Sequence, residues 1–161
     1  MFAPFDKWET PRIGIDFGGV IVKPSNEENP LNPDFGLDIQ QDGAIESIKE
    51  LVLMSKSNLW IISKASKPTQ HLTRKWLNKV NFYQKTGFYA SNLLFCCKRS
   101  EKAKLSQPLN LTHFIDDRLD VLENLKDLIP NLFLFGKDYA PNGIFPVKNW
   151  QTLLNTITKG C

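Results

Sequence analysis

Short apolar runs alternate along this chain with longer segments in which apolar residues recur every three or four positions. The short runs predict five strands, at residues 12–22, 59–63, 93–97, 112–115 and 132–135. The longer segments predict five helices, at residues 43–56, 66–80, 101–107, 119–129 and 149–158. Strands and helices that alternate in this way favour an α/β fold, in which a parallel sheet with right-handed crossovers lies between two layers of helices.

Polar segments indicate how the chain is organised. Residues 1–11 mix aromatic, charged and proline residues and are interpreted as an N-terminal extension. Residues 23–42 are interpreted as a loop, because Pro24, Pro30 and Pro33 interrupt the hydrogen bonding of both helices and strands. This loop is too short to hold an inserted domain. With 161 residues, of which 42% are hydrophobic, the chain is expected to form one domain over residues 1–161 with a buried core.

Charge is distributed unevenly, although the formal net charge is only +3. Residues 64–104 contain ten lysines and arginines and one acidic residue, whereas residues 1–63 contain five basic and ten acidic residues. A basic block of this kind suits an anionic substrate, although a solvated helix face is the more common origin of such a run. The charge by itself therefore gives only weak support for a nucleic-acid partner.

The cysteines and the hydropathy pattern indicate a compartment. Cys96 and Cys97 are adjacent and Cys161 is remote from them, so neither a disulfide framework nor a Cys-x-x-Cys metal site is expected. The first residues lack the basic and apolar sections of a signal peptide, and no window reaches the roughly 18 apolar residues of a membrane span. We therefore expect a soluble, cytoplasmic protein without a membrane partner.

Polar side chains stand where three of the predicted strands end. Asp16 closes the first apolar run and Ser63 the second, and the pair Asp116-Asp117 closes the fourth. Because parallel strands share one carboxyl edge, these side chains are expected to meet there, where open α/β sheets bind ligands. Each also has a simpler explanation, since Asp and Ser are common in turns and acidic residues favour the starts of helices.

The chemistry of this set points to phosphoryl transfer. Carboxylates that converge at one edge repel one another unless a cation neutralises them, and oxygen ligands without histidine or cysteine indicate Mg²⁺. A hydroxyl and an ammonium in the same crevice would bind phosphoryl oxygens, which leaves Asp16 to attack phosphorus and form an aspartyl-phosphate. The ammonium is expected from Lys102 or Lys98, which precede the strand that ends in the acidic pair.

In this order, the residues resemble the four motifs of the haloacid-dehalogenase-like (HAD) superfamily. The family motifs are an Asp that ends the first strand, a Ser or Thr, a Lys, and an acidic pair. They are matched by Asp16, Ser63, Lys102 and the pair Asp116-Asp117, with Lys98 as the alternative for the lysine. The resemblance covers nearly the whole chain and implies a Rossmann-like (HAD-like) sheet, a phosphohydrolase or phosphotransferase activity, and Mg²⁺ as cofactor.

The resemblance also implies a role for each matched position. The catalytic residues would be Asp16, Ser63 and Lys102. The phosphate would be held by Ser63, Lys64, Lys102 and Gly19. The metal would be held by Asp16, Asp116, Asp117 and the backbone carbonyl of Gly18.

One position departs from the family pattern. Family phosphatases carry a second Asp two residues after the nucleophile, where it protonates the leaving group and then activates water, but this chain has Gly18 there. Loss of general acid–base catalysis typically slows a reaction by about 10²–10⁴ without preventing nucleophilic attack. The alternative to an enzyme is therefore a catalytically impaired phosphate-binding or protein-interaction module on the same scaffold.

The resemblance bears on the substrate as well. Neither interval in which the family inserts a cap domain is long enough here for a large cap, so the crevice is expected to be open. By resemblance, capless members often act on phosphate groups of large molecules. We therefore expect a phosphorylated substrate, with a macromolecule such as a nucleic-acid end as one option, and the sequence leaves the oligomeric state open.

Overall fold

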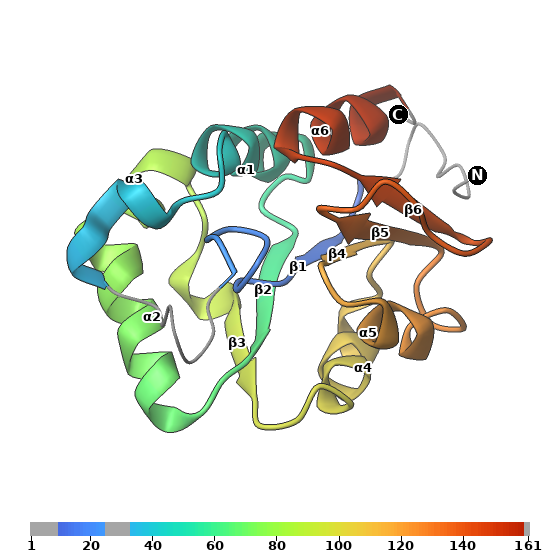
Figure 1. Cartoon of the computed structure of the whole chain (residues 1–161), viewed down its shortest axis with the longest axis horizontal. Coiled ribbons are helices and arrows are strands. Elements are labelled where there is room, and N and C mark those ends of the chain that lie inside the picture. Colours follow the sequence, from blue (N-terminus) through green and yellow to red (C-terminus); the bar gives the residue numbers. More distant parts are fainter. Residues whose placement is uncertain (1–9, 25–32, 160–161) are drawn as a thin grey trace.

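The computed structural model describes residues 10–24 and 33–159, and these residues form a sheet of six parallel strands (Figure 1). The strands are β1 (Ile13–Ile15), β2 (Leu59–Lys64), β3 (Leu93–Cys96), β4 (His113–Asp116), β5 (Asn131–Phe135) and β6 (Ile144–Val147). Their order across the sheet is β3-β2-β1-β4-β5-β6. Every pairing is parallel, which confirms the predicted α/β fold class.

Helices on both faces of the sheet complete the three predicted layers. One face is covered by α1 (Ala44–Met54), α2 (Lys67–Lys79), α3 (Phe82–Thr86) and α6 (Trp150–Lys159), and the other by α4 (Glu101–Ser106) and α5 (Leu119–Asn124) (Figure 1). Successive strand residues point to opposite faces, so Ile61 packs in the first core and Ile62 in the second. None of the helices within the described residues combines the length and hydrophobicity needed to cross a bilayer.

The first strand is shorter than predicted. It ends at Ile15 instead of Val22, because the chain turns back directly after Asp16. In this turn the carbonyl of Phe17 accepts hydrogen bonds from the N–H groups of Ile21 and Val22, at 2.9 and 3.3 Å. The apolar residues after Asp16 are therefore buried in a compact turn and not in a longer strand.

Other elements also differ from the predicted pattern. The segment 23–42, expected to be a loop, contains a 3₁₀ helix at Pro33–Ile39 that is kinked at Gly36. The helix expected at 119–129 ends at Asn124, and neither β6 nor α3 is predicted by the sequence pattern. Residues 1–9 of the expected N-terminal extension, residues 25–32 and Cys161 lie outside the described residues.

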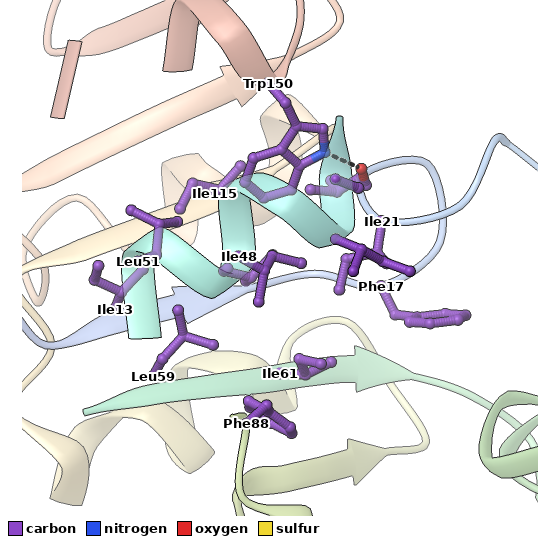
Figure 2. Packing of buried hydrophobic residues seen from close by; sticks show 14 of the residues in the cluster. Ile13, Phe17, Ile21, Ile48, Leu51, Leu59, Ile61, Phe88, Ile115 and Trp150 are labelled. Atoms are coloured by element: carbon purple, nitrogen blue, oxygen red, sulfur yellow. Dashed lines mark hydrogen bonds between the residues drawn. The ribbon is translucent and has the colours of Figure 1, made fainter. Parts of the chain in front are cut away.

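The turn after β1 is held in place by the helix α6. Trp150, the first residue of α6, is 1% exposed, and its indole Nε1 donates a hydrogen bond to the carbonyl of Val20 at 2.8 Å (Figure 2). Its ring packs against Phe135, with ring centroids 5.6 Å apart. Ile48 and Leu51 of α1 lie in the same buried cluster (Figure 2). The segment that follows Asp16 is thus fixed from within the core.

Candidate active site

Asp16 and Asp116 meet where the strand order changes direction. β1 lies between β2 and β4, so the chain builds the sheet outward to both sides from this point. Ile15 and Ile115 are register partners, and the N–H of Asp16 donates to the carbonyl of Ile115 at 2.9 Å. In open α/β sheets, ligands bind beyond the carboxyl ends of the strands at such a switch point. The sheet therefore brings the two carboxylates to a position that suits ligand binding.

One ammonium joins the two carboxylates. Lys102, in the first turn of α4, is 3% exposed, and its Nζ lies 2.9 Å from Asp16 Oδ1 and 2.8 Å from Asp116 Oδ2. Lys98, the alternative lysine, is exposed, and its backbone N–H donates to Glu101 Oε1 at 2.9 Å at the start of α4. The fold thus brings Lys102, and not Lys98, to the carboxylates.

Burial and charge oppose each other in this cluster. Burial raises the pKa of Asp16 to about 6, although the Lys102 ammonium acts to lower it. Burial, together with the charge of Asp16, likewise raises the pKa of Asp116 to about 6. Burial alone would lower the pKa of Lys102, but the two carboxylates outweigh it and the pKa is raised. The ammonium therefore stays charged, and the carboxylates are stabilised by positive charge facing them.

Asp117 joins the cluster over a glycine. Its carboxylate lies directly above Gly19, where a Cβ would collide with it, and Gly19 has a φ of +82° that side chains rarely adopt. The N–H of Gly19 donates to the carbonyl of Val22 at 2.9 Å, so this residue supplies space and not a free donor. Asp116 is held from the other side, because the N–H of Arg118 donates to its Oδ1 at 3.0 Å.

A cavity of about 330 Å³ opens above these groups. The predicted site residues that line it are Asp16, Gly18, Gly19, Ser63, Lys64, Lys102 and Asp117. Asp116 is fully buried and is linked to the cavity through Lys102. The structure therefore gathers all the predicted site residues in or next to one cavity.

Exposed polar residues form the mouth of this cavity, which we define as Lys64, Ser66, Thr69, Arg99 and Arg118. Apart from Lys64, sequence reasoning did not identify them as site residues. Ser66 caps α2, and its hydroxyl accepts from the N–H of Thr69 at 3.4 Å. The basic excess over residues 64–104 was the available signal for Arg99, and the position directly after the acidic pair was the signal for Arg118.

The carboxylates form a set that fits a hard divalent cation. One oxygen from each of Asp16, Asp116 and Asp117 lies within 4.8 Å of the others. Carboxylate and carbonyl oxygens are the ligands that Mg²⁺ prefers in proteins. Three ionised carboxylates and the Lys102 ammonium leave two negative charges, which a divalent cation would balance. Both the donor chemistry and the charge therefore fit Mg²⁺.

Comparison with known proteins identifies the fold. No protein-family model and no curated protein sequence matches the chain. Among solved structures, the D,D-heptose 1.7-bisphosphate phosphatase from B. bronchiseptica, complexed with magnesium and phosphate, has a TM-score of 0.67 at 12% identity, over 92% of this chain and 98% of its own. DsGPDH of Dunaliella salina has a TM-score of 0.55 at 15% identity, over 88% of this chain and 28% of its own. The chain therefore has the Rossmann-like, HAD-like fold that its motifs indicate.

Proposed function

We propose that this protein is a Mg²⁺-dependent phosphohydrolase or phosphotransferase that acts through an aspartyl-phosphate on Asp16. The observation that carries the proposal is the buried contact of Lys102 with Asp16 and Asp116 beneath an open cavity. A purely structural ion pair needs no cavity above it, whereas a nucleophile needs access to its substrate. Asp16 is 7% exposed and lines the cavity, so it is both held in place and accessible.

Each neighbouring side chain has a part in this reaction. The carboxylate of Asp16 attacks phosphorus, and the attack needs positive charge and hydrogen-bond donors around the phosphoryl oxygens. Lys102 supplies charge from below the cavity, and the hydroxyl of Ser63 and the ammonium of Lys64 supply donors at its wall. Gly19 supports the site by giving room to Asp117.

The metal would be held by Asp16, Asp116, Asp117 and the backbone carbonyl of Gly18. When bound, Mg²⁺ neutralises negative charge and so allows an anionic nucleophile to approach an anionic phosphoryl group. The proposal is supported by the cluster of carboxylate oxygens within 4.8 Å of one another. It also agrees with the fold neighbour from B. bronchiseptica, which is a phosphatase complexed with magnesium and phosphate.

Hydrolysis of p-nitrophenyl phosphate, measured with and without Mg²⁺, tests this function. Asp16→Asn keeps the size of the side chain but removes the nucleophile, so turnover should be lost. The matched control is Asp127→Asn, which removes an exposed carboxylate in the turn before β5, at the opposite edge of the sheet, and should leave turnover unchanged. Equal Mg²⁺-dependent turnover in the natural protein and in Asp16→Asn would contradict the proposal.

A second candidate is a phosphate-binding module without turnover. It is favoured by Gly18, which lines the cavity and has no side chain, so this position of the cavity wall offers no acid or base. Titration calorimetry with inorganic phosphate and Mg²⁺ distinguishes the two candidates. Phosphate binding that Lys102→Met abolishes, in a protein without turnover, would support the module, whereas Asp16-dependent turnover would exclude it.

A further inference from the structure

We infer that the substrate carries its phosphoryl group on a leaving group that departs as a stable anion, as in a phosphoanhydride or an acyl phosphate. The inference rests on the proposed function and names its substrate class. It depends on where the cavity has acids and where it has cations.

The acidic side chains that line the cavity lie on the same side of the phosphorus atom as the nucleophile. Within the described residues, the lining contains two carboxylates, Asp16 and Asp117, and no histidine. Both belong to the cluster with Asp116, in which the oxygens lie within 4.8 Å of one another. In an in-line displacement, the leaving oxygen departs from the face of phosphorus opposite the attacking Asp16 oxygen. The described acids thus lie beside the nucleophile and not where the leaving group departs.

Gly18 adds no proton donor to the cavity, although the structure has room for one. An ideal Cβ on Gly18 would meet no atom within 4 Å, and Gly18 is not among the glycines with positive φ. Neither space nor backbone conformation therefore requires glycine at this position, in contrast to Gly19. An alkoxide leaving group needs a proton from a nearby acid, and the described lining offers none on that side.

Positive charge lines the mouth instead. Lys64 and Arg99 are exposed there, and neither takes part in an ion pair within the described residues. Arg118 is also at the mouth, where its Nε lies 3.1 Å from Asp120 Oδ1. Ammonium and guanidinium groups keep their protons at neutral pH, so they stabilise an anion without protonating it. A departing carboxylate or phosphate suits this mouth, whereas a neutral alcohol gains little from it.

The reaction balances without a proton donor. An Asp16 oxygen forms a bond to phosphorus, the bond from phosphorus to the leaving oxygen breaks, and the electron pair departs with the carboxylate or phosphate. Water then attacks the aspartyl-phosphate, the electron pair of the broken bond returns to the Asp16 carboxylate, and inorganic phosphate and a solvent-bound proton are released. Because the described lining offers no separate base for this water, the second step should be slow.

The test compares leaving groups by kcat/KM, which reports on the first step. Pyrophosphate releases phosphate and acetyl phosphate releases a carboxylate, whereas glycerol 2-phosphate must release an alcohol. We expect the natural protein to favour the first two over the ester by about 10²–10⁴, the usual contribution of general acid catalysis. Gly18→Asp should raise the rate with the ester and narrow this ratio. Gly18→Asn introduces a side chain of the same size as Gly18→Asp but without an acid. It should leave the ratio of kcat/KM between the first two substrates and the ester unchanged.

A second comparison tests the cationic mouth. Arg99→Gln should lower kcat/KM for pyrophosphate about tenfold, because a charge-assisted contact to the leaving phosphate is lost. Lys126→Gln, which removes an exposed cation beyond α5 at the opposite edge of the sheet, is the matched control and should change nothing. The ratio of rates with pyrophosphate and acetyl phosphate then shows whether phosphate or carboxylate is the preferred leaving group.

The outcomes separate the inference from the function on which it rests. Asp16-dependent turnover with the expected ratio supports both. Asp16-dependent turnover of glycerol 2-phosphate and pyrophosphate at equal kcat/KM overturns the inference and leaves the proposed function standing. If no substrate is turned over in an Asp16-dependent manner, including by Gly18→Asp, the proposed function fails and the inference fails with it.

Discussion

Removal of Lys102 should destabilise the protein, and the loss should depend on pH. Lys102→Met keeps a long side chain but removes the ammonium that lies 2.9 Å from Asp16 Oδ1 and 2.8 Å from Asp116 Oδ2. The side chains of Lys102, Asp16 and Asp116 are 3%, 10% and 0% exposed, so water from the cavity could reach Asp16 in place of the ammonium but could not reach Asp116. The variant would leave two carboxylates buried together without a cation.

The magnitude follows from this burial. Removal of one partner from a buried ion pair typically costs about 3–5 kcal/mol, because the remaining charge stays desolvated. Burial already raises the pKa of Asp16 and of Asp116 to about 6, from 3.8, and loss of Lys102 should raise both further. Protonation of these carboxylates then favours the folded state. The deficit should therefore be largest at pH 8 and above, shrink as the pH falls toward about 6, and be smallest below that, where the carboxylates are protonated in both proteins.

Urea unfolding at pH 8 and pH 5 measures both effects. The matched control is Lys104→Met, an exposed lysine on the same helix, which should change the free energy of unfolding by no more than about 0.5 kcal/mol. Adding Asp116→Asn to Lys102→Met should recover part of the loss, because one of the two unpaired charges is removed. Equal losses for Lys102→Met and Lys104→Met, or a Lys102→Met loss that is the same at both pH values, would refute this reasoning.

Three other changes give predictions for independent measurements. Burial lowers the pKa of His113 from 6.5 to about 4, so its contribution to stability is complete above pH 6.5 and falls by up to about 3 kcal/mol toward pH 4. In urea unfolding, the free energy of unfolding of His113→Gln should therefore decline less over this pH range than that of the natural protein, and an identical decline would contradict the prediction. Gly14→Ala places a Cβ 2.6 Å from Phe114 Cδ2 and should cost about 1–3 kcal/mol, whereas Gly18→Ala, which meets open space, should be neutral by the same assay. Mg²⁺ at a hundredfold excess over its Kd should add about 2.7 kcal/mol of stability, seen as a rise in Tm, and a rise that persists in Asp116→Asn would argue against the site.

The sequence pattern predicts the sheet well but misses its last strand, for a physical reason. β6 contains Pro146, which cannot donate a ladder hydrogen bond, and prolines usually argue against a strand. Here β6 is an edge strand that pairs only with β5 among the described strands, so the missing donor is tolerated. The helix α3 is missed because it has five residues, between Asn81 and Gly87 in left-handed conformations, and five residues are too few to show helical periodicity.

The candidate site is predictable to the extent that it depends on strand ends. Asp16, Ser63 and Asp116 could be placed together because parallel strands share one carboxyl edge. The lysine could not be placed by this argument, because Lys98 and Lys102 both lie between the end of β3 and the first turn of α4. The turn between these elements decides which lysine is buried and whether Arg99 reaches the mouth, and no periodic pattern encodes a turn of this kind.

The hydrogen bond from Trp150 to Val20 joins residues that are 130 positions apart. On the ribosome, where chains grow at about 5–20 residues per second, the turn that follows Asp16 emerges on the order of ten seconds before the helix that holds it. A nascent chain that stops before Trp150 would contain every motif residue, from Asp16 to Asp117, without the contact that fixes the turn beside Asp16. The turn beside the Asp16 carboxylate therefore lacks this stabilising hydrogen bond until α6 has been synthesised and has packed onto the sheet.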